Sequence, residues 1–433
     1  MKYYSLQHNA PKASFKEAVI RGIAPDKGLY FPENIAPLEP VFFKNIKDYS
    51  NEEIAYRTIS QFVGDEIDPT SLQQIVQETL SFDFPLVNIT ENISTLELFH
   101  GPTMAFKDVG ARFMARCLGY FAETSSKPQD VTVLVATSGD TGGAVANGFL
   151  GVEGVKVVIL YPSGKVSDIQ EKQLTTLGQN ITALEVNGTF DDCQAMVKTA
   201  FLDDEITSRR QLTSANSINV ARWLPQSFYF IFALKQLEEI SKPLVFSVPS
   251  GNFGNICAGM MAYKLGMPVH QFIASVNQND VVPRYMENGE YLPKPSIATI
   301  SNAMDVGDPS NFVRIRELFD NDFDSLSKLL TSYSFNDTVT RNAIKTLYDS
   351  YKYIADPHGA VGYLGLVEYL KKNKSVQGVF LETAHPIKFL DVVEKAIASE
   401  VTLPESISEL IQKKKESILI KNYQEFKTYM MDS

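Results

Sequence analysis

Short apolar runs alternate with helix-like segments through the middle of the chain. Residues 131–136, 155–161, 181–186 and 244–248 are compact runs rich in β-branched side chains, without alternation of apolar and polar positions. Such runs are typical of strands that are buried on both faces. Because each run leads through a turn into a stretch with helical periodicity, the pattern predicts an α/β fold with parallel sheets covered by helices. Ligands in such folds bind at the carboxyl ends of the strands.

The two ends of the chain carry different patterns. The N-terminal part combines scattered Pro, Tyr and Phe with helical stretches at 51–62 and 71–80. Residues 305–353 are charged and mostly helical, and 404–431 predict one or two amphipathic helices. We therefore expect three domains: an N-terminal domain, 1–85; a large domain, 86–125 and 215–433; and a small α/β domain, 126–214.

Composition and charge narrow the class of protein. A chain of 433 residues with 44% hydrophobic content can bury more than one core. The net charge of -11 argues against a nucleic-acid binder, because phosphate backbones need clustered Lys and Arg. Three cysteines without C-x-x-C spacing favour free thiols in a reducing compartment. With no apolar signal core and no run near the ~20 residues that span a bilayer, we expect a cytoplasmic protein without a membrane partner.

One lysine has surroundings that suit chemistry. Lys107 follows an apolar, strand-like run at 93–99 and lies among small and aromatic residues. A solvated lysine has a pKa near ~10.4 and is protonated at neutral pH, so partial burial is the usual way to free its amine for a Schiff base. The alternative is an ordinary surface cation.

Two glycine-rich turns connect a strand to a helix. Residues 251–255 place glycines where backbone N–H groups can approach an anion at a helix start, which predicts a phosphate site; a tight turn without a ligand is the alternative. Neither G-x-G-x-x-G nor the P-loop pattern occurs, so nucleotides fit less well. The turn at 138–143 offers donors for a carboxylate, and its Asp140 is either a functional group or a helix cap.

Two further segments gather polar side chains after strand-like runs. Residues 214–222 hold hydroxyl and amide groups with one guanidinium, Arg222, a set that suits a phosphoryl group. The alternative is a polar loop that caps the following helix. Residues 382–389 follow a strand at 378–381. Their His385 and Lys388 are candidates for the mouth of a site. The alternatives are a structural role for His385 and a solvated side chain for Lys388.

These motifs, in the order in which they occur along the chain, resemble those of the threonine synthase family. The resemblance starts in the N-terminal part, at 14–18 and 22–30, and extends over almost the whole chain. Several independent motifs in the family order are more specific than any one of them. The matching segments are 100–108, which resembles the family's His-Gly-Pro-Thr-x-Ala-Phe-Lys-Asp motif; 138–142, Ser-Gly-Asp-Thr-Gly; 216–222, Asn-Ser-x-Asn-x-x-Arg; 251–255, Gly-Asn-Phe-Gly-Asn; and the closing motif at 382–389.

The resemblance implies a pyridoxal 5'-phosphate enzyme of fold type II, with parallel or mixed sheets flanked by helices and an added N-terminal domain. Lys107 would be the catalytic residue that holds the cofactor, and no metal is expected. The other implied cofactor-binding residues are Gly251, Asn252, Phe253, Gly254 and Asn255 at the cofactor phosphate, and Thr383 at the pyridine nitrogen. The implied substrate-binding residues are Ser138, Asp140, Thr141, Asn216, Ser217, Asn219 and Arg222.

The implied reaction converts O-phospho-L-homoserine and water into L-threonine and phosphate, by γ-elimination of phosphate and addition of water at the β carbon. Two alternatives stay open. A phospho-lyase could release phosphate from a related phosphorylated amino acid and end in an oxo acid and ammonia. A protein that binds pyridoxal phosphate without turnover is the other, although an intact Lys107 counts against it.

Overall fold

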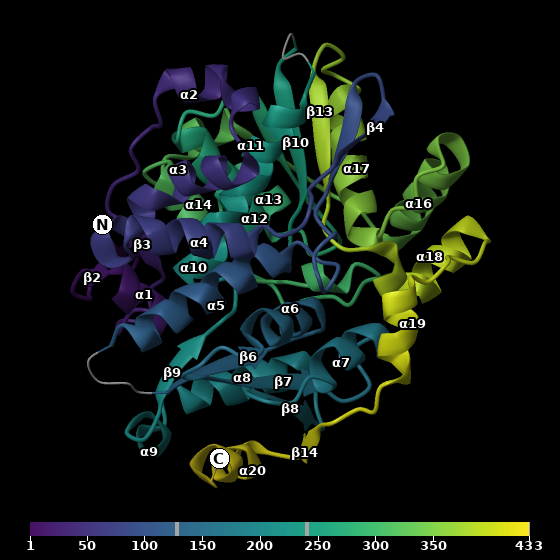
Figure 1. Ribbon diagram of the computed structural model, residues 1–433. Helices are drawn as coiled ribbons and strands as arrows, with labels where there is room; N and C mark the ends of the chain where they lie inside the picture. Colours follow the sequence, from purple (N-terminus) through teal and green to yellow (C-terminus); the bar gives the residue numbers. More distant parts are fainter. Residues whose placement is uncertain (126–129, 239–241, 433) are drawn as a thin grey trace.

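The computed structural model describes residues 1–125, 130–238 and 242–432. In this part of the chain, a large and a small β-sheet lie one above the other, with helices α5 (Lys107–Glu123) and α6 (Asp140–Phe149) between them (Figure 1). The large sheet has, in spatial order, β12 (Leu330–Ser334), β11 (Gln271–Val276), β10 (Leu244–Pro249), β13 (Gln377–Glu382), β5 (Ile93–Glu97) and β4 (Leu86–Thr90).

The strands of the large sheet are parallel to their neighbours, except that β4 runs antiparallel to β5 at one edge. Successive residues of β10 belong to different cores, because side chains alternate between the two faces of a strand. Val245 packs with α16 (Asp337–Tyr351) and α17 (Pro357–Leu370), whereas Phe246 packs with α11 (Ser227–Gln236) and α12 (Gly254–Lys264). Burial on both faces explains the continuous apolar run in the sequence.

The small sheet is built in the same way. Alternate residues of its central strands face either α5 and α6 or α8 (Phe190–Ala200). Among the described residues its strands are parallel, in the order β14 (Ile418–Ile420), β8 (Ile181–Val186), β7 (Val155–Pro162), β6 (Val131–Ala136) and β9 (Gln211–Ser214).

The N-terminal part forms a small antiparallel sheet and several helices that pack on α5 and α11. Its Tyr3 and Phe15 belong to the same core as Phe121 of α5. The elements are β1 (Lys2–Ser5), β2 (Ala13–Ser14), α1 (Phe15–Arg21), β3 (Tyr30–Pro32), α2 (Pro40–Lys44), η1 (Ile46–Asp48), α3 (Asn51–Val63), η2 (Gly64–Glu66) and α4 (Pro69–Thr79).

Shorter helices connect and cover the two larger sheets. Helix α7 packs on α6 and α19, and α13 packs on β12. These remaining elements are α7 (Asp168–Thr175), α9 (Asp204–Thr207), α10 (Val220–Trp223), η3 (Leu224–Gln226), α13 (Val281–Asn288), η4 (Asn302–Met304), α14 (Phe312–Leu318), α15 (Phe323–Ser327), η5 (Pro386–Phe389), α18 (Leu390–Ile397), α19 (Glu405–Gln412) and α20 (Tyr423–Asp432).

The predicted α/β class, with parallel and mixed sheets and an N-terminal domain, is confirmed. Two segments differ from the sequence-based expectation. The charged stretch 305–353 contains a strand, β12, whose polar and aromatic side chains hide it among helices. The C-terminal stretch, assigned to the large domain, instead adds β14 to the small sheet beside β8 and packs α20 on α8 and α9. The expected boundary at 125/126 adjoins residues 126–129, outside the described ranges.

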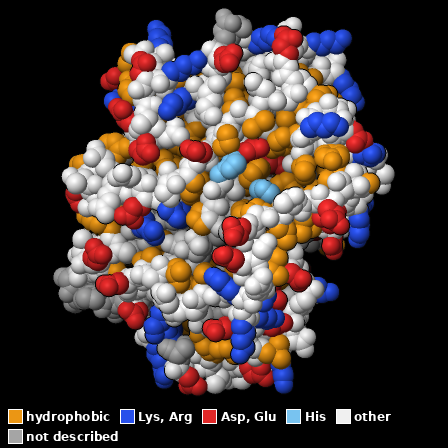
Figure 2. All heavy atoms as spheres, turned by 45° about the vertical axis from the view of Figure 1, so that its right-hand side comes forward, with side chains coloured by type: hydrophobic (Ala, Val, Ile, Leu, Met, Phe, Trp, Pro, Cys, Tyr) orange, Lys and Arg blue, Asp and Glu red, His pale blue; other side chains and the backbone are white. Residues whose placement is uncertain are grey.

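The surface mixes charges of both signs. Figure 2 shows acidic and basic side chains interspersed over one face, with hydrophobic side chains between them. This distribution accompanies the net negative charge of the chain and provides no continuous basic face in this view. None of the helices in the described residues is long and apolar enough to cross a membrane.

Candidate active site

The motifs singled out from the sequence lie where strands of both larger sheets end. A polar cluster at the carboxyl ends of parallel strands is the usual location of a ligand site in an α/β fold. The five segments are 98–107 after β5, 138–143 after β6, 214–222 after β9, 251–255 after β10 and 383–388 after β13.

Lys107 is the first residue of α5, and its side chain is only 16% exposed. The residue before it is held from two sides, because the Phe106 N–H donates to the Thr383 carbonyl at 2.9 Å and the Tyr229 hydroxyl donates to the Phe106 carbonyl. Burial lowers the pKa of Lys107; the carboxylate of Asp140 opposes this effect, and the charge of Lys388 reinforces it. The net effect on the pKa of Lys107 is downward, toward the free amine.

The segment that precedes Lys107 is folded back on itself. The buried Asp108 carboxylate accepts hydrogen bonds from the Thr103 N–H at 2.9 Å and the Thr103 hydroxyl at 2.5 Å. Met104 has a left-handed backbone with φ 56°, which is uncommon for a residue with a side chain. Burial raises the pKa of Asp108. This loop fixes where α5 begins and thus where the Lys107 side chain starts.

Asp140 does not cap its helix through its side chain. It is the first residue of α6, and its carboxylate turns to other side chains: it accepts hydrogen bonds from Lys388 Nζ at 2.7 Å and Gln170 Nε2 at 2.9 Å, and lies 3.6 Å from Lys107 Nζ. Its pKa results from burial, which raises it, and from Lys388 and Lys107, which lower it well below the usual range. Of the two interpretations of Asp140, the structure excludes a cap formed by its side chain, and the functional role stays a prediction.

The turn that starts α6 requires glycine. Gly139 has φ 140°, and a Cβ there would lie 2.4 Å from the Gln170 side chain. Thr137 Oγ1 accepts the N–H groups of Gly139 at 3.0 Å and Gly142 at 2.8 Å, which fixes the turn. Ser138 and Thr141 are partly exposed beside it. The first N–H groups of α6 have no partner within the helix, an arrangement that suits a carboxylate.

The turn after β10 has the features of an anion site. Phe253 adopts a left-handed backbone, φ 59°, directly before α12, and a Cβ on Gly251 would lie 2.7 Å from the Ala303 carbonyl oxygen. Both polar side-chain atoms of Asn255 are buried and have no hydrogen-bond partner among the described residues. An unpartnered amide at a helix N-terminus fits a bound phosphate. Gly251, Asn252, Phe253, Gly254 and Asn255 thus form one close-fitting turn.

The 214–222 segment touches this turn. Ser217 Oγ accepts hydrogen bonds from Asn252 Nδ2 at 2.7 Å and Asn311 Nδ2 at 3.2 Å. Asn216 donates to the Ala136 carbonyl at 3.2 Å and is partly exposed, as is Ser217. The two phosphate sites that the sequence suggested therefore lie side by side, with Ser217 and Asn252 at their junction.

Asn219 and Arg222 lie beneath the exposed part of the segment. The Asn219 amide donates to the Val19 carbonyl at 2.9 Å and the Ser214 carbonyl at 3.2 Å, and its oxygen caps α10. Arg222 donates from Nη1 to the Ala215 carbonyl, while its buried Nε has no hydrogen-bond partner in the described ranges. Burial lowers the pKa of Arg222 to about 10, so it stays a cation at neutral pH.

Arg222 and Lys107 lie on the same side of α5. Gly110, one helical turn after Lys107, faces Arg222, because a Cβ on Gly110 would lie 3.2 Å from Arg222 Nε and 2.6 Å from its carbonyl oxygen. Residues three apart on a helix share a face. A glycine at 110 thus allows the guanidinium to lie directly below the helix turn that carries Lys107.

Thr383 follows β13 and has a hydroxyl that forms no hydrogen bond with any described residue. Its backbone is tied to the Lys107 segment through the Phe106 N–H and through the bridge between Ala105 and Ala384. His385 is half-buried, and its Nδ1 accepts the Ile387 N–H at 3.2 Å. Burial lowers the pKa of His385 to about 4.

Sequence reasoning missed three residues of this region. Gln170 supports Asp140, but its position in the Ser167 capping box signals only a helix start. The Asn311 amide donates hydrogen bonds to the Ser217 hydroxyl and to the Asn252 carbonyl. Arg314 is fully buried and donates to the carbonyls of Tyr30, Ser217 and Ile218. These three come from helices or loops distant in sequence, without a local motif.

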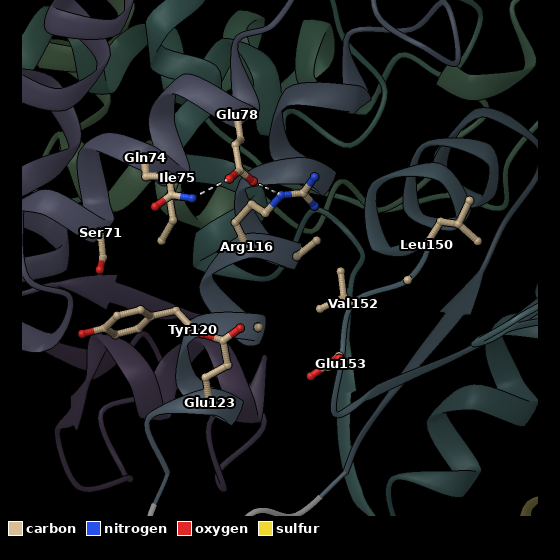
Figure 3. A pocket seen from close by; sticks show the side chains of 13 residues that line it. Ser71, Gln74, Ile75, Glu78, Arg116, Tyr120, Glu123, Leu150, Val152 and Glu153 are labelled. Atoms are coloured by element: carbon tan, nitrogen blue, oxygen red, sulfur yellow. Dashed lines mark hydrogen bonds and ion pairs between the residues drawn. The ribbon is translucent and has the colours of Figure 1, made fainter.

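A separate groove lies between α4, α5 and the loop after α6 (Figure 3). Figure 3 shows Glu78 between Gln74 and Arg116, and Arg116 Nε donates to Glu78 at 2.6 Å. Tyr120 of this groove lies 13 residues after Lys107 on α5, about 20 Å away at 1.5 Å per residue. The groove is therefore distinct from the cluster at the strand ends.

This fold, with a buried lysine before a helix and a glycine turn that suits a phosphate, defines a pyridoxal-phosphate-dependent enzyme. The family "Pyridoxal-phosphate dependent enzyme" matches residues 93–381, "Threonine synthase N terminus" matches 2–80, and "Threonine synthase, C-terminal" matches 359–430. The chain belongs to the threonine synthase family, and is a lyase whose cofactor is pyridoxal phosphate.

Curated relatives and solved structures agree with the family. A threonine synthase from Serratia marcescens is 43% identical over 409 residues, which cover 94% of each chain. The crystal structure of threonine synthase from Escherichia coli has a TM-score of 0.93 at 41% identity and covers 100% of both chains. That of a pyridoxal-phosphate-bound threonine synthase from Brucella melitensis also has a TM-score of 0.93, at 34% identity, and covers 100% of this chain and 99% of its own.

Proposed function

We propose that the chain converts O-phospho-L-homoserine and water into L-threonine and phosphate, by γ-elimination of phosphate and addition of water at the β carbon. One observation carries the proposal: the 214–222 segment, which contains the cation Arg222, adjoins the turn suited to the cofactor phosphate, and Asn252 of that turn donates a hydrogen bond to Ser217. A substrate with its own phosphate needs a second anion site beside that of the cofactor. Arg222 supplies a buried cation for it.

Lys107 would hold pyridoxal phosphate and then act on the substrate. When bound, the cofactor supplies an electron sink for a carbanion at the α carbon of the substrate. Lys107 would take protons from the α and β carbons as phosphate leaves, and would return protons to the γ carbon, which becomes the methyl group of threonine, and to the α carbon after water has added at the β carbon; this requires an amine that is neutral in its resting state. The burial of Lys107 at 16% exposure supports this role.

The remaining residues would bind and orient. The first N–H groups of α6, with Ser138 and Thr141, would hold the substrate carboxylate. Asn216, Ser217 and Arg222 would hold the substrate phosphate and offset the charge that develops as it leaves. Asn219 would act through the shape of the segment, since both of its amide hydrogens are already bonded.

Gly251, Asn252, Phe253, Gly254 and Asn255 would bind the cofactor phosphate, and the Thr383 hydroxyl would bond the pyridine nitrogen. A hydroxyl is uncharged, so it would leave that nitrogen largely unprotonated. We place the reaction in the cytoplasm as part of this proposal. The three cysteines, Cys117, Cys193 and Cys257, are all free and buried, which supports a reducing compartment.

The test is a coupled assay of phosphate and threonine from phosphohomoserine. We expect one threonine for each phosphate released by the unmutated protein. Lys107→Ala should release neither product. Release of phosphate with an oxo acid in place of threonine would establish the phospho-lyase alternative. Cofactor trapped on Lys107 by reduction, without phosphate release from any phosphorylated amino acid, would establish binding without turnover.

A further inference from the structure

A second lysine lies deeper in the active site than Lys107. The side chain of Lys388, at the end of η5, is 0% exposed, and its ammonium contacts the Asp140 carboxylate at 2.7 Å and the Thr103 carbonyl at 2.8 Å. A buried ammonium is costly unless it is paired, so a lysine retained at this depth indicates a specific partner. That partner is the carboxylate that also faces Lys107.

Asp140 divides its two oxygens between the two lysines. Oδ1 receives Lys388 Nζ at 2.7 Å and Gln170 Nε2 at 2.9 Å, whereas Oδ2 lies 3.6 Å from Lys107 Nζ. The closer and fully buried pair is Asp140 with Lys388. Because opposite charges within a few ångströms neutralise each other, Asp140 is left with little unbalanced charge to hold Lys107 as an ammonium.

The charged groups around Lys107 come from four elements. Asp140 lies on α6, Lys388 on η5 and Arg222 on α10, and Asp108 on α5 itself is bonded to Thr103. Asp140 lies 3.6 Å from Lys107 Nζ, and the charges of Lys388 and Arg222 also act on the amine. A Lys107 ammonium would be a third cation beside a single close carboxylate, so the neutral amine is favoured.

We propose that Lys388 is a positioning residue of the active site, which holds Asp140 across the boundary between the two larger sheets and offsets its charge, so that the Lys107 nitrogen, whether free or bound to the cofactor, is favoured in its unprotonated form. The inference rests on the proposed role of Lys107 in holding the cofactor. Lys388 Nζ also donates a hydrogen bond to the Thr103 carbonyl. One side chain therefore contacts both the loop that precedes Lys107 and the first turn of α6.

The test uses the full-length holoenzyme without substrate. The Schiff base of Lys107 with pyridoxal phosphate absorbs differently when protonated, so a pH titration of absorbance gives the midpoint of that protonation. In Lys388→Met the midpoint should move upward by about one pH unit or more, since a nearby charge shifts a pKa by ~1–3. Lys388→Arg, which keeps the charge, should stay near the unmutated protein.

Asp140→Asn should move the midpoint in the opposite direction, because it removes the carboxylate that lies 3.6 Å from Lys107 Nζ. Lys371→Met is the matched control: Lys371 also pairs with a carboxylate, Glu368, but its side chain is 63% exposed. An unmoved midpoint in a folded, cofactor-loaded Lys388→Met protein would overturn the inference. If that variant does not bind cofactor, a midpoint in Asp140→Asn that does not fall overturns it instead.

The two proposals fail in different ways. Borohydride reduction of the unmutated holoenzyme, followed by peptide mapping, first shows whether Lys107 carries the cofactor. Neither this step nor the titration involves phosphohomoserine. A wrong substrate would therefore leave both measurements unchanged, whereas a wrong role for Lys388 would appear in the titration alone.

Discussion

Buried ionisable groups are held in different charge states at the two ends of the active site. At the phosphate end, formed by residues 214–222 and 251–255 with Arg314, burial lowers the pKa of Arg222 and of Arg314 to about 10, which leaves both cationic at pH 7. At the ring end, residues 382–385, burial lowers the pKa of His385 to about 4. Burial and Asp356 raise the pKa of Glu382 well above its usual range. Both shifts favour the uncharged form of the ring-end groups.

The difference follows from ordinary pKa values. Burial shifts every group toward its neutral form, but arginine starts so high that it stays charged, whereas for histidine and glutamate the shift favours the uncharged form at pH 7. Burial of arginine at one end and of weaker acids and bases at the other is what we expect of a site that holds anions at one end and an uncharged ring at the other. Thr383, whose hydroxyl carries no charge, lies in the neutral end.

The phosphate end itself contains two unlike cations. Arg314 donates to three backbone carbonyls and to the Asn311 side chain, so its donors are used by the protein. Among the described residues, Arg222 donates to the Ala215 carbonyl, and its Nε has no hydrogen-bond partner. Among the described residues neither arginine has a carboxylate within 4.0 Å. We infer that Arg222 meets the substrate and that Arg314 builds the site.

Arg222→Met should have the largest effect. Loss of one partner of a desolvated charge pair costs ~2–5 kcal/mol, so kcat/KM for phosphohomoserine should fall roughly 30- to 5,000-fold. Cofactor affinity and the denaturation midpoint should change little. Steady-state kinetics with a cofactor titration measures both, and Arg21→Met, in an exposed pair with Glu17, is the control. Loss of cofactor with retained substrate affinity would mean that the two phosphate sites are exchanged.

Arg314→Met should act mainly on stability. The change leaves the buried carbonyl of Tyr30 and the partly buried carbonyls of Ser217 and Ile218 without their donor, and each buried unsatisfied group costs ~1–3 kcal/mol. We expect a loss of about 3 kcal/mol or more in the free energy of unfolding, measured by denaturant titration. A stable Arg314→Met protein with a raised KM would contradict the distinction between the two arginines.

The sequence predicted the strand ends of this site well, because buried parallel strands leave continuous apolar runs. Residues 131–136 and 181–186 match β6 and β8 at both ends. Arg314 was not predictable in the same way: it lies in the helical stretch Phe312–Leu318 and reaches Ser217 only through the fold. The left-handed backbones at Met104 and Phe253 likewise depend on tertiary packing.

The states of charge were also beyond sequence reasoning. Lys388 was expected to be either solvated or at the mouth of the site, yet its side chain is 0% exposed and paired with Asp140. Glu382 carries no local signal, since burial and the neighbouring Asp356 determine its protonation. Motifs identify which residues meet a ligand, whereas burial determines the charge with which they meet it.

His385 offers a pH test of the neutral end. The unfolded chain binds a proton on a histidine below its ordinary pKa of ~6.5, whereas the folded chain binds one on His385 only below about 4. Stability should therefore fall as pH falls from 6.5 to 4. His385→Asn should lose less over this window, by about 1–2 kcal/mol after allowance for partial exposure. The free energy of unfolding of both proteins is measured by denaturant titration at pH 6.5 and at pH 4. If the unmutated protein and His385→Asn lose the same amount between these pH values, His385 does not titrate this way.

Glu382→Gln should have the smallest effect, and of the opposite sign. Glu382 Oε1 accepts the Asp356 N–H at 2.5 Å, while Oε2 has no hydrogen-bond partner among the described residues. Oε2 lies against Gly359, where a Cβ would be 1.5 Å away. The raised pKa means that the folded chain keeps a proton that the unfolded chain loses above about pH 4.3, so this group costs stability as pH rises.

An amide keeps the shape of the protonated acid and the bond to Asp356 without that cost. The unmutated protein and Glu382→Gln should therefore be nearly equal in stability at pH 5. At pH 8 the variant should be the more stable by about 1 kcal/mol, a modest gain because its NH₂ takes the unpartnered position of Oε2. Glu368→Gln, at an exposed pair, should show no such divergence. A variant that is less stable than the unmutated protein at pH 8 would mean that Glu382 is ionised, and that the ring end is not neutral after all.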